Sequence, residues 1–162
     1  MSTLNITEEA ARTAHENAKA SGKELLENLF GKKVFQKDVK QRIQSIDDAV
    51  KELGENDQDV IDYLKLINTG ISGHILYTQM LVVIIKALNE GWVPNWQNGE
   101  WDKWYPYFYM DDSSSSGRFS FDYSVNRYSR STVGSRLCFK SRELCEYAAK
   151  TFLGIYRNFF TI

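Results

Sequence analysis

The sequence predicts an α+β fold, in which a helical N-terminal half is followed by a small antiparallel three-stranded sheet closed by a C-terminal helix. The position of the aromatic residues is one reason, because only four of them precede residue 91 and eighteen follow it. The other reason is the spacing of apolar residues, which is helical before Gly91 and alternates after Trp104. Apolar residues make up 43% of the chain and aromatic residues 14%, which is enough to build a core.

The length of 162 residues is typical of one domain with an appended segment. We expect residues 1–37 to form a helical arm and residues 38–162 to form a single α+β domain with a Trp-rich loop at 92–104. The arm is rich in alanine and in charged residues. Such a surface is typical either of a solvated helix or of one that packs on a neighbour or on a second copy of the chain.

Capping residues mark the expected helix starts in the first half. Thr7 followed by two glutamates predicts one start, and Ser21 with Glu24 forms a capping-box pattern for a second short helix. Ser45 with Asp48 forms the same pattern, and it opens a helix that ends before Gly54.

The longest apolar stretch predicts a buried central helix from Ser72 to Glu90, preceded by a helix that Asn56 or Asp57 caps. Gly91 then fits the left-handed position that follows a helix end, and the next apolar residue folds back on the last turn. We therefore expect a positive φ at Gly91 and Trp92 packed on the central helix.

Three short segments in the second half are predicted to be the strands of an antiparallel meander. They are Tyr105–Met110, interrupted by Pro106 as on an edge strand, then Arg118–Arg130, and finally Leu137–Phe139. The middle segment alternates, which places one set of side chains on a buried face: Phe119, Phe121, Tyr123 and Val125.

The last helix is expected over residues 142–160, with apolar side chains at three-to-four spacing. Phe152 and Tyr156 stand in the middle of this stripe. A strand and a helix that are adjacent in sequence each bury one face, so we expect this stripe to form the main aromatic core with Phe119 or Phe121.

Three blocks of the second half carry a resemblance: residues 87–96 (ALNEGWVPNW), 103–108 (KWYPYF) and 134–144 (GSRLCFKSREL). In this order they resemble a module in small uncharacterised proteins of phages, prophages and mobile elements of gut Bacteroidales. The similarity covers roughly residues 40–160. The chain departs from the relatives' Asp, Tyr and Gly at three positions, Asn95, Trp104 and Ala149. The resemblance implies a phage or mobile-element origin, but no activity and no catalytic residue. Because no apolar segment of a secretory signal follows Met1 and there are only two cysteines, we expect the protein in the cytoplasm of the host bacterial cell.

The residues that would carry catalysis or bind a metal are sparse. Two cysteines and two distant histidines, His15 and His74, have neither zinc-ligand spacing nor the arrangement of a nucleophile and its base. The most apolar stretch contains Gln79 and Lys86, and it is too short to span a membrane. We therefore expect a protein that is not an enzyme, binds no cofactor and does not enter a membrane.

Charge is unevenly distributed, since residues 1–90 have a net charge of −3 and residues 91–162 of +2. Aromatic and arginine side chains are typical anchors of interfaces. The expected partner-binding residues are Trp96, Trp101, Trp104, Tyr107, Arg118, Arg127, Arg130 and Arg136. Alternation leaves another reading open, in which the rings fill a seam between sheet and helices while the arginines are solvated on the opposite face.

These features favour a protein partner, from the host or the phage, and a second copy of the chain bound through the N-terminal helices. Single-stranded nucleic acid is the second expectation, because its binders combine basic tracks with stacking aromatic rings. A structural component of the virion is the third.

Overall fold

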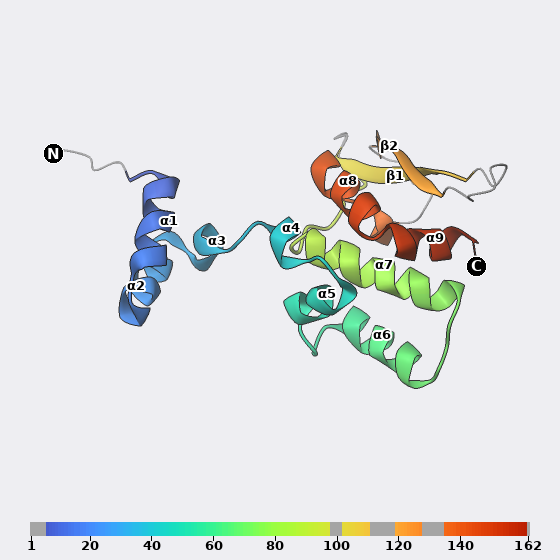
Figure 1. Ribbon diagram of the computed structural model, residues 1–162, viewed down its shortest axis with the longest axis horizontal. Helices are drawn as coiled ribbons and strands as arrows, with labels where there is room; N and C mark the ends of the chain where they lie inside the picture. Colours follow the sequence, from blue (N-terminus) through green and yellow to red (C-terminus); the bar gives the residue numbers. More distant parts are fainter. Residues whose placement is uncertain (1–5, 98–101, 111–118, 128–134, 162) are drawn as a thin grey trace. The chain divides into compact units, whose positions relative to one another are not determined.

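The computed structural model describes residues 6–97, 102–110, 119–127 and 135–161, and the chain divides into two compact units, Met1–Asp38 and Val39–Ile162. The first unit is helical (Figure 1), with α1 at Glu8–Asn17, α2 at Ala20–Phe30 and α3 at Lys32–Phe35. The hydroxyl of Thr7 accepts a hydrogen bond from the Ala10 amide at 3.2 Å, as expected for the cap of α1. The expected capping box at Ser21 is wrong, because α2 already begins at Ala20 and Lys19 caps it without a side-chain bond.

The second unit contains the remaining helices and the sheet. Its elements are α4 (Val39–Arg42), α5 (Ile46–Leu53), α6 (Gln58–Asn68), α7 (His74–Leu88), β1 (Lys103–Tyr109), β2 (Ser120–Arg127), the 3-10 helix η1 (Ser135–Leu137), α8 (Arg142–Thr151) and α9 (Leu153–Thr161). Figure 1 shows α7 between α5 and α6 on one side and α9 on the other, with α8 lying against the sheet. The α+β class and the helical N-terminal half are thus confirmed.

The core of the second unit is built around α7, which is apolar over most of its circumference. Six of its side chains are at most 1% exposed: Leu81, Val83, Ile84, Ile85, Ala87 and Leu88. Helices from both ends of the unit contribute to the same cluster, including Val60 of α6 and Cys145 of α8. α7 is therefore the central helix that the sequence predicts, although it begins after Gly73 and not at Ser72.

Local capping positions the ends of the helices beside α7. The Ser45 hydroxyl accepts a hydrogen bond from the Asp48 amide at 3.1 Å, and the Asp57 carboxylate accepts one from the Asp59 amide at 3.0 Å. At the other end of α7, Glu90 has φ 50° and Gly91 has φ 82°, which confirms the left-handed position expected for Gly91. This turn sends the chain back across the last turns of α7.

The expectation of a three-stranded sheet is wrong, because within the described residues the sheet consists of β1 and β2. The third segment forms η1 and then a single bridge, in which Phe139 and Trp104 exchange backbone hydrogen bonds of 2.9 and 3.0 Å. Ser141 caps α8 only two residues later. The segment between η1 and α8 is therefore too short for more than one strand pair.

A β-bulge changes which side chains share a face of the sheet. Tyr107 pairs with Tyr123 and the next residue, Phe108, pairs with Phe121, so Asp122 has no opposite residue. Consequently Phe121 and Tyr123 lie on opposite faces, and the expectation that they share a buried face is wrong. Tyr123 is 49% exposed.

The C-terminal helical region is interrupted at Phe152, where φ is −105° and ψ is 26°, so α8 and α9 replace the single expected helix. Gly154, a residue of low helix propensity, follows shortly after the break. Phe152 and Tyr156 are both buried, at 4% exposure each. The ring that joins the sheet to this stripe is Phe108, whose centroid lies 4.8 Å from that of Tyr156.

Candidate functional site

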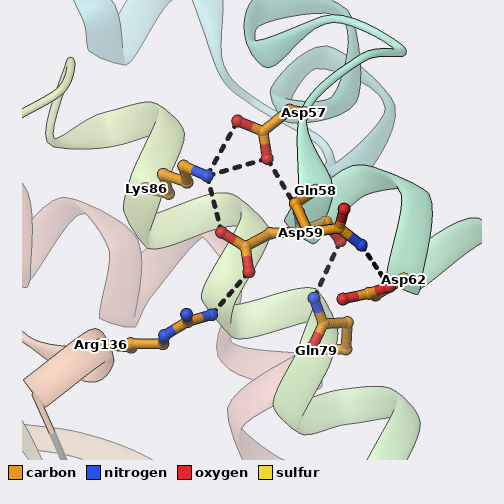
Figure 2. Close-up of polar contacts among 7 residues, drawn as sticks. All are labelled: Asp57, Gln58, Asp59, Asp62, Gln79, Lys86 and Arg136. Carbon is orange, nitrogen blue, oxygen red and sulfur yellow. Dashed lines mark hydrogen bonds and ion pairs between the residues drawn. The ribbon is translucent and has the colours of Figure 1, made fainter.

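A cluster of paired charges lies between α6 and α7. Figure 2 shows Lys86 of α7 between two carboxylates, with its ammonium 2.8 Å from Asp57 and 2.7 Å from Asp59. Lys86 lies on a largely apolar helix and its side chain is 40% exposed, so its partly buried ammonium is stabilised by an opposite charge. The two aspartates supply it because one caps α6 and the other stands in its first turn.

Arg136 of η1 completes the cluster from a distant part of the chain. One of its guanidinium nitrogens lies 2.6 Å from Asp59, whose side chain is only 12% exposed, whereas the Arg136 side chain is 69% exposed. The Gln79 side chain donates a hydrogen bond of 2.8 Å to the Asp59 carbonyl oxygen. The backbone and the side chain of Asp59 are therefore both bound, so α6, α7 and η1 meet at this residue.

The pairing shifts two of the titrating groups. Burial by itself raises the pKa of Asp57, but the hydrogen bonds from Lys86 and from the Asp59 amide outweigh it and lower the pKa. Burial lowers the pKa of Lys86, and the bonds to the two aspartates outweigh this and raise it. Both groups therefore remain charged at neutral pH, and the cluster of two carboxylates and two cations is balanced.

A pocket of about 480 Å³ opens beside this cluster. The segment that follows α7 forms one wall, with Trp92, Val93, Pro94 and Trp96. Val82 and Lys86 of α7, Asn89 and Cys138 line it as well, together with Asp59 and Arg136. The pocket thus combines two indole rings and a proline ring with fixed charges. This combination is typical of sites that hold an apolar group with a polar edge.

The walls of the pocket are held by buried polar groups. The fully buried Lys103 places its ammonium 5.7 Å from the ring centroid of Trp96 and bonds to Asp102. The Asn89 side chain donates to the Cys138 carbonyl oxygen at 2.8 Å and accepts from the Lys140 amide at 3.0 Å. These contacts join the end of α7 to the segment after η1, and they fix both sides of the pocket before any ligand binds.

Two of the expected partner-binding residues, Trp96 and Arg136, line this pocket. Trp104 packs against the hydrophobic core, and Tyr107 is 36% exposed and stacks on Tyr123 at 5.1 Å between centroids. Arg127 donates to the carbonyl oxygen of its neighbour Asn126. The remaining three, Trp101, Arg118 and Arg130, lie outside the described residues.

The sequence reasoning did not single out Asp59, Lys86 or Asn89 as site residues. Lys86 could have been identified from the sequence, because a lone lysine within a buried apolar helix implies a carboxylate partner. The pair of aspartates at the start of α6 was the nearest candidate in sequence. Nothing local distinguished Asn89, because its two bonds reach residues about fifty positions away.

The histidines and cysteines of the described residues have structural contacts. His15 bonds to Glu27 at 2.9 Å and stacks on Phe35, while His74 stacks on Phe159 and bonds to its carbonyl oxygen. Burial is the main cause that raises the pKa of the Cys138 thiol to about 11, and it also raises that of Cys145. Little reactive thiolate therefore forms at neutral pH.

Across the described ranges, His, Cys, Asp and Glu side chains do not gather in any group of three that is able to hold a metal ion. Nor does any helix in this part of the chain combine the length and the apolar character needed to cross a membrane.

The chain matches no family model, no curated protein and no solved structure.

Proposed function

We propose that the chain is a non-catalytic accessory protein of a phage or mobile element, which acts in the host cytoplasm by binding a protein partner. The observation that carries this proposal is the pocket where Trp92 and Trp96 meet the charge cluster of Asp59, Lys86 and Arg136. Aromatic rings and arginine side chains are typical anchors of protein interfaces. The phage origin rests on the resemblance of the three sequence blocks.

The residues that line the pocket determine which kind of partner side chain it can bind. Its walls combine indole and proline rings with charged side chains, and its two cations are already paired with Asp57 and Asp59. A strongly charged ligand would have to displace one of these pairs. We therefore propose that the partner inserts an apolar or aromatic side chain, whose polar edge reaches the exposed guanidinium of Arg136.

Affinity capture from infected cells, quantified by mass spectrometry, tests this proposal when wild type is compared with Trp96→Ala and Trp96→Phe. We expect a specific partner to be retained by wild type, largely retained by Trp96→Phe and lost by Trp96→Ala. Ile75→Ala is the matched control, because Ile75 is 59% exposed at the start of α7, about 16 Å along the helix from Lys86. Equal capture by all four proteins, with unchanged unfolding midpoints, would rule out the pocket.

A second candidate function, binding of single-stranded nucleic acid, is favoured by one observation on the sheet. The stacked pair Tyr107 and Tyr123 is exposed, and the register places Arg127 on the same face, because alternate pairs share a face. Exposed rings on a sheet beside a cation are typical stacking platforms for bases.

Titration of fluorescent single-stranded oligonucleotides tests this candidate. We expect an affinity that falls steeply with added salt and falls again in Tyr123→Ala. No binding at low salt would remove the nucleic-acid function and leave the protein partner.

A further inference from the structure

The N-terminal unit has little core of its own. Among the side chains of residues 6–38 whose burial the structure describes, Ala11 alone is buried, at 3% exposure. Its other internal contacts are mainly the stack of His15 on Phe35, the edge of Phe30 on the same ring and the bond from His15 to Glu27. Helical units of this size rarely bury enough apolar surface to be stable without a partner.

Helix α2 turns its largest apolar side chains away from this small core. Leu25 is 59% exposed and Leu29, one helical turn later, is 67% exposed. Glu27, by contrast, is directed to His15 of α1. The leucines therefore form a stripe on the outer face of α2, where the unit itself provides nothing to cover them within the described residues.

Helix α1 has a concave surface, in contrast to the projecting leucines of α2. A shallow hollow runs along its outer face and is lined by small and polar side chains: Thr7, Glu9, Ala10, Thr13, Ala14 and Asn17. Ala10 and Ala14 recur one turn apart in this hollow and are both exposed. Small residues at this spacing allow the side chains of another helix to pack closely between them.

We propose that the chain forms a dimer through its N-terminal unit, with Leu25 and Leu29 of each copy seated on the Ala10–Ala14 hollow of the other. One unit carries both the projecting stripe and the hollow, so a two-fold pairing uses each of them twice. Charge is compatible with the same occupant, because residues 6–38 carry six acidic and six basic side chains and two copies have no net repulsion.

The dimer would bring two copies of residues 39–162 into one assembly and thus two of the pockets described above. A partner with repeated binding sites would then be held by both at once, which raises the apparent affinity without any new contact. This consequence rests on the proposed function, whereas the pairing itself does not.

Sedimentation velocity of the full chain over a range of concentrations tests the pairing, because it measures mass and needs no partner. Wild type is expected at twice 18.7 kDa. Leu25→Gln with Leu29→Gln, which preserves helix propensity, is expected to raise the dissociation constant at least tenfold. Ala10→Leu with Ala14→Leu fills the hollow, leaves the stripe intact and should have the same effect.

Leu64→Gln with Ile67→Gln is the matched control, since these residues are 38% and 47% exposed on α6 and should leave the dimer unchanged. Unaltered helical circular dichroism in both test variants establishes that they remain folded. A wild-type chain that stays monomeric near 100 μM overturns the proposal. A dimer that persists in both test variants overturns it as well.

Discussion

At the scale of single residues, the end of α7 shows how a local backbone conformation shapes the candidate site. Glu90 and Gly91 both have positive φ, and Glu90 bonds to Arg42 at 2.7 Å and to Lys140 at 2.9 Å. Residues other than glycine rarely adopt a positive φ, and Glu90 does so while both ion pairs hold its side chain. The turn delivers Trp92 to the pocket, so the pocket wall depends on two consecutive backbone angles.

Gly91→Val should destabilise the protein by about 1 kcal/mol or more, because valine is strained at φ 82°. A Cβ at this position would meet nothing within 4 Å, so the effect would come from the backbone alone. Gly154→Ala is the control, since it is helical and equally open, and it should be neutral or stabilising. Urea denaturation measures both, and equal midpoints for Gly91→Val and wild type would contradict the assignment.

Asp57 should make stability depend on pH. Its pKa is lower in the folded protein than the ordinary 3.8, so it contributes stability above that value and loses this contribution as the pH falls below it. Urea denaturation at pH 6 and pH 3 should therefore show a larger loss in wild type than in Asp57→Asn. Lys86→Met removes the partner and should flatten the dependence in the same way, whereas unchanged slopes in both variants would contradict this account.

At the scale of elements, the sheet is joined to the helices through aromatic rings and not through a third strand. Phe108 of β1 stacks on Phe119 at 4.7 Å and lies 4.8 Å from Tyr156 of α9. Phe121 contacts Phe108 edge-on and lies under the ammonium of Lys150 of α8. The bulge makes these contacts possible, because it returns Phe121 to the helical side while it leaves Tyr123 exposed.

Phe152→Ala should destabilise the second unit by about 3–5 kcal/mol, because Phe152 stands where α8 meets α9 and is 4% exposed. Domain stabilities are typically about 5–15 kcal/mol, so we expect this variant to be only partly folded at 37 °C. Guanidinium denaturation followed by circular dichroism gives the value. Phe160→Ala is the control. Phe160 lies on α9 and is 41% exposed, so this substitution should lower the free energy of unfolding much less. An unaltered midpoint in Phe152→Ala, together with loss of a partner, would identify the stripe as an interface.

At the scale of the whole molecule, the hydrophobic core is confined to the second unit. All the buried residues of the main cluster lie between Val39 and Tyr156. The Tyr147 hydroxyl lies 2.6 and 2.7 Å from the carbonyl oxygens of Lys40 and Ile43 and shares its one proton between them, so it anchors the first segment of this unit to α8. The second unit therefore builds its hydrophobic core from its own residues.

Removal of residues 1–38 should leave the cooperative unfolding of the second unit unchanged. Urea denaturation of the shortened and the full chain, followed by tryptophan fluorescence, compares them directly, because all four tryptophans lie after residue 91. We expect equal midpoints. A clearly lower midpoint for the shortened chain would show that the N-terminal unit stabilises the rest.

The features that depend on contacts within a few residues could be predicted from the sequence. The caps at Thr7, Ser45 and Asp57 and the positive φ of Gly91 were predictable, because a side chain there bonds to a nearby amide or a glycine tolerates a rare angle. The alternating pattern of β2 also predicted a strand, since period two reflects the local geometry of the backbone.

The number of strands, the bulge and the candidate site depend on contacts between distant segments, and no local pattern predicts them. The bulge and the single bridge at Phe139 depend on which residues of β1 they oppose, and the pattern within one segment does not specify that. The site joins Asp59 to Lys86 across 27 residues and to Arg136 across 77. The buried carboxylate of Asp59 is stabilised by cations that the fold brings close to it. The spacing of these residues in the sequence does not predict that they meet.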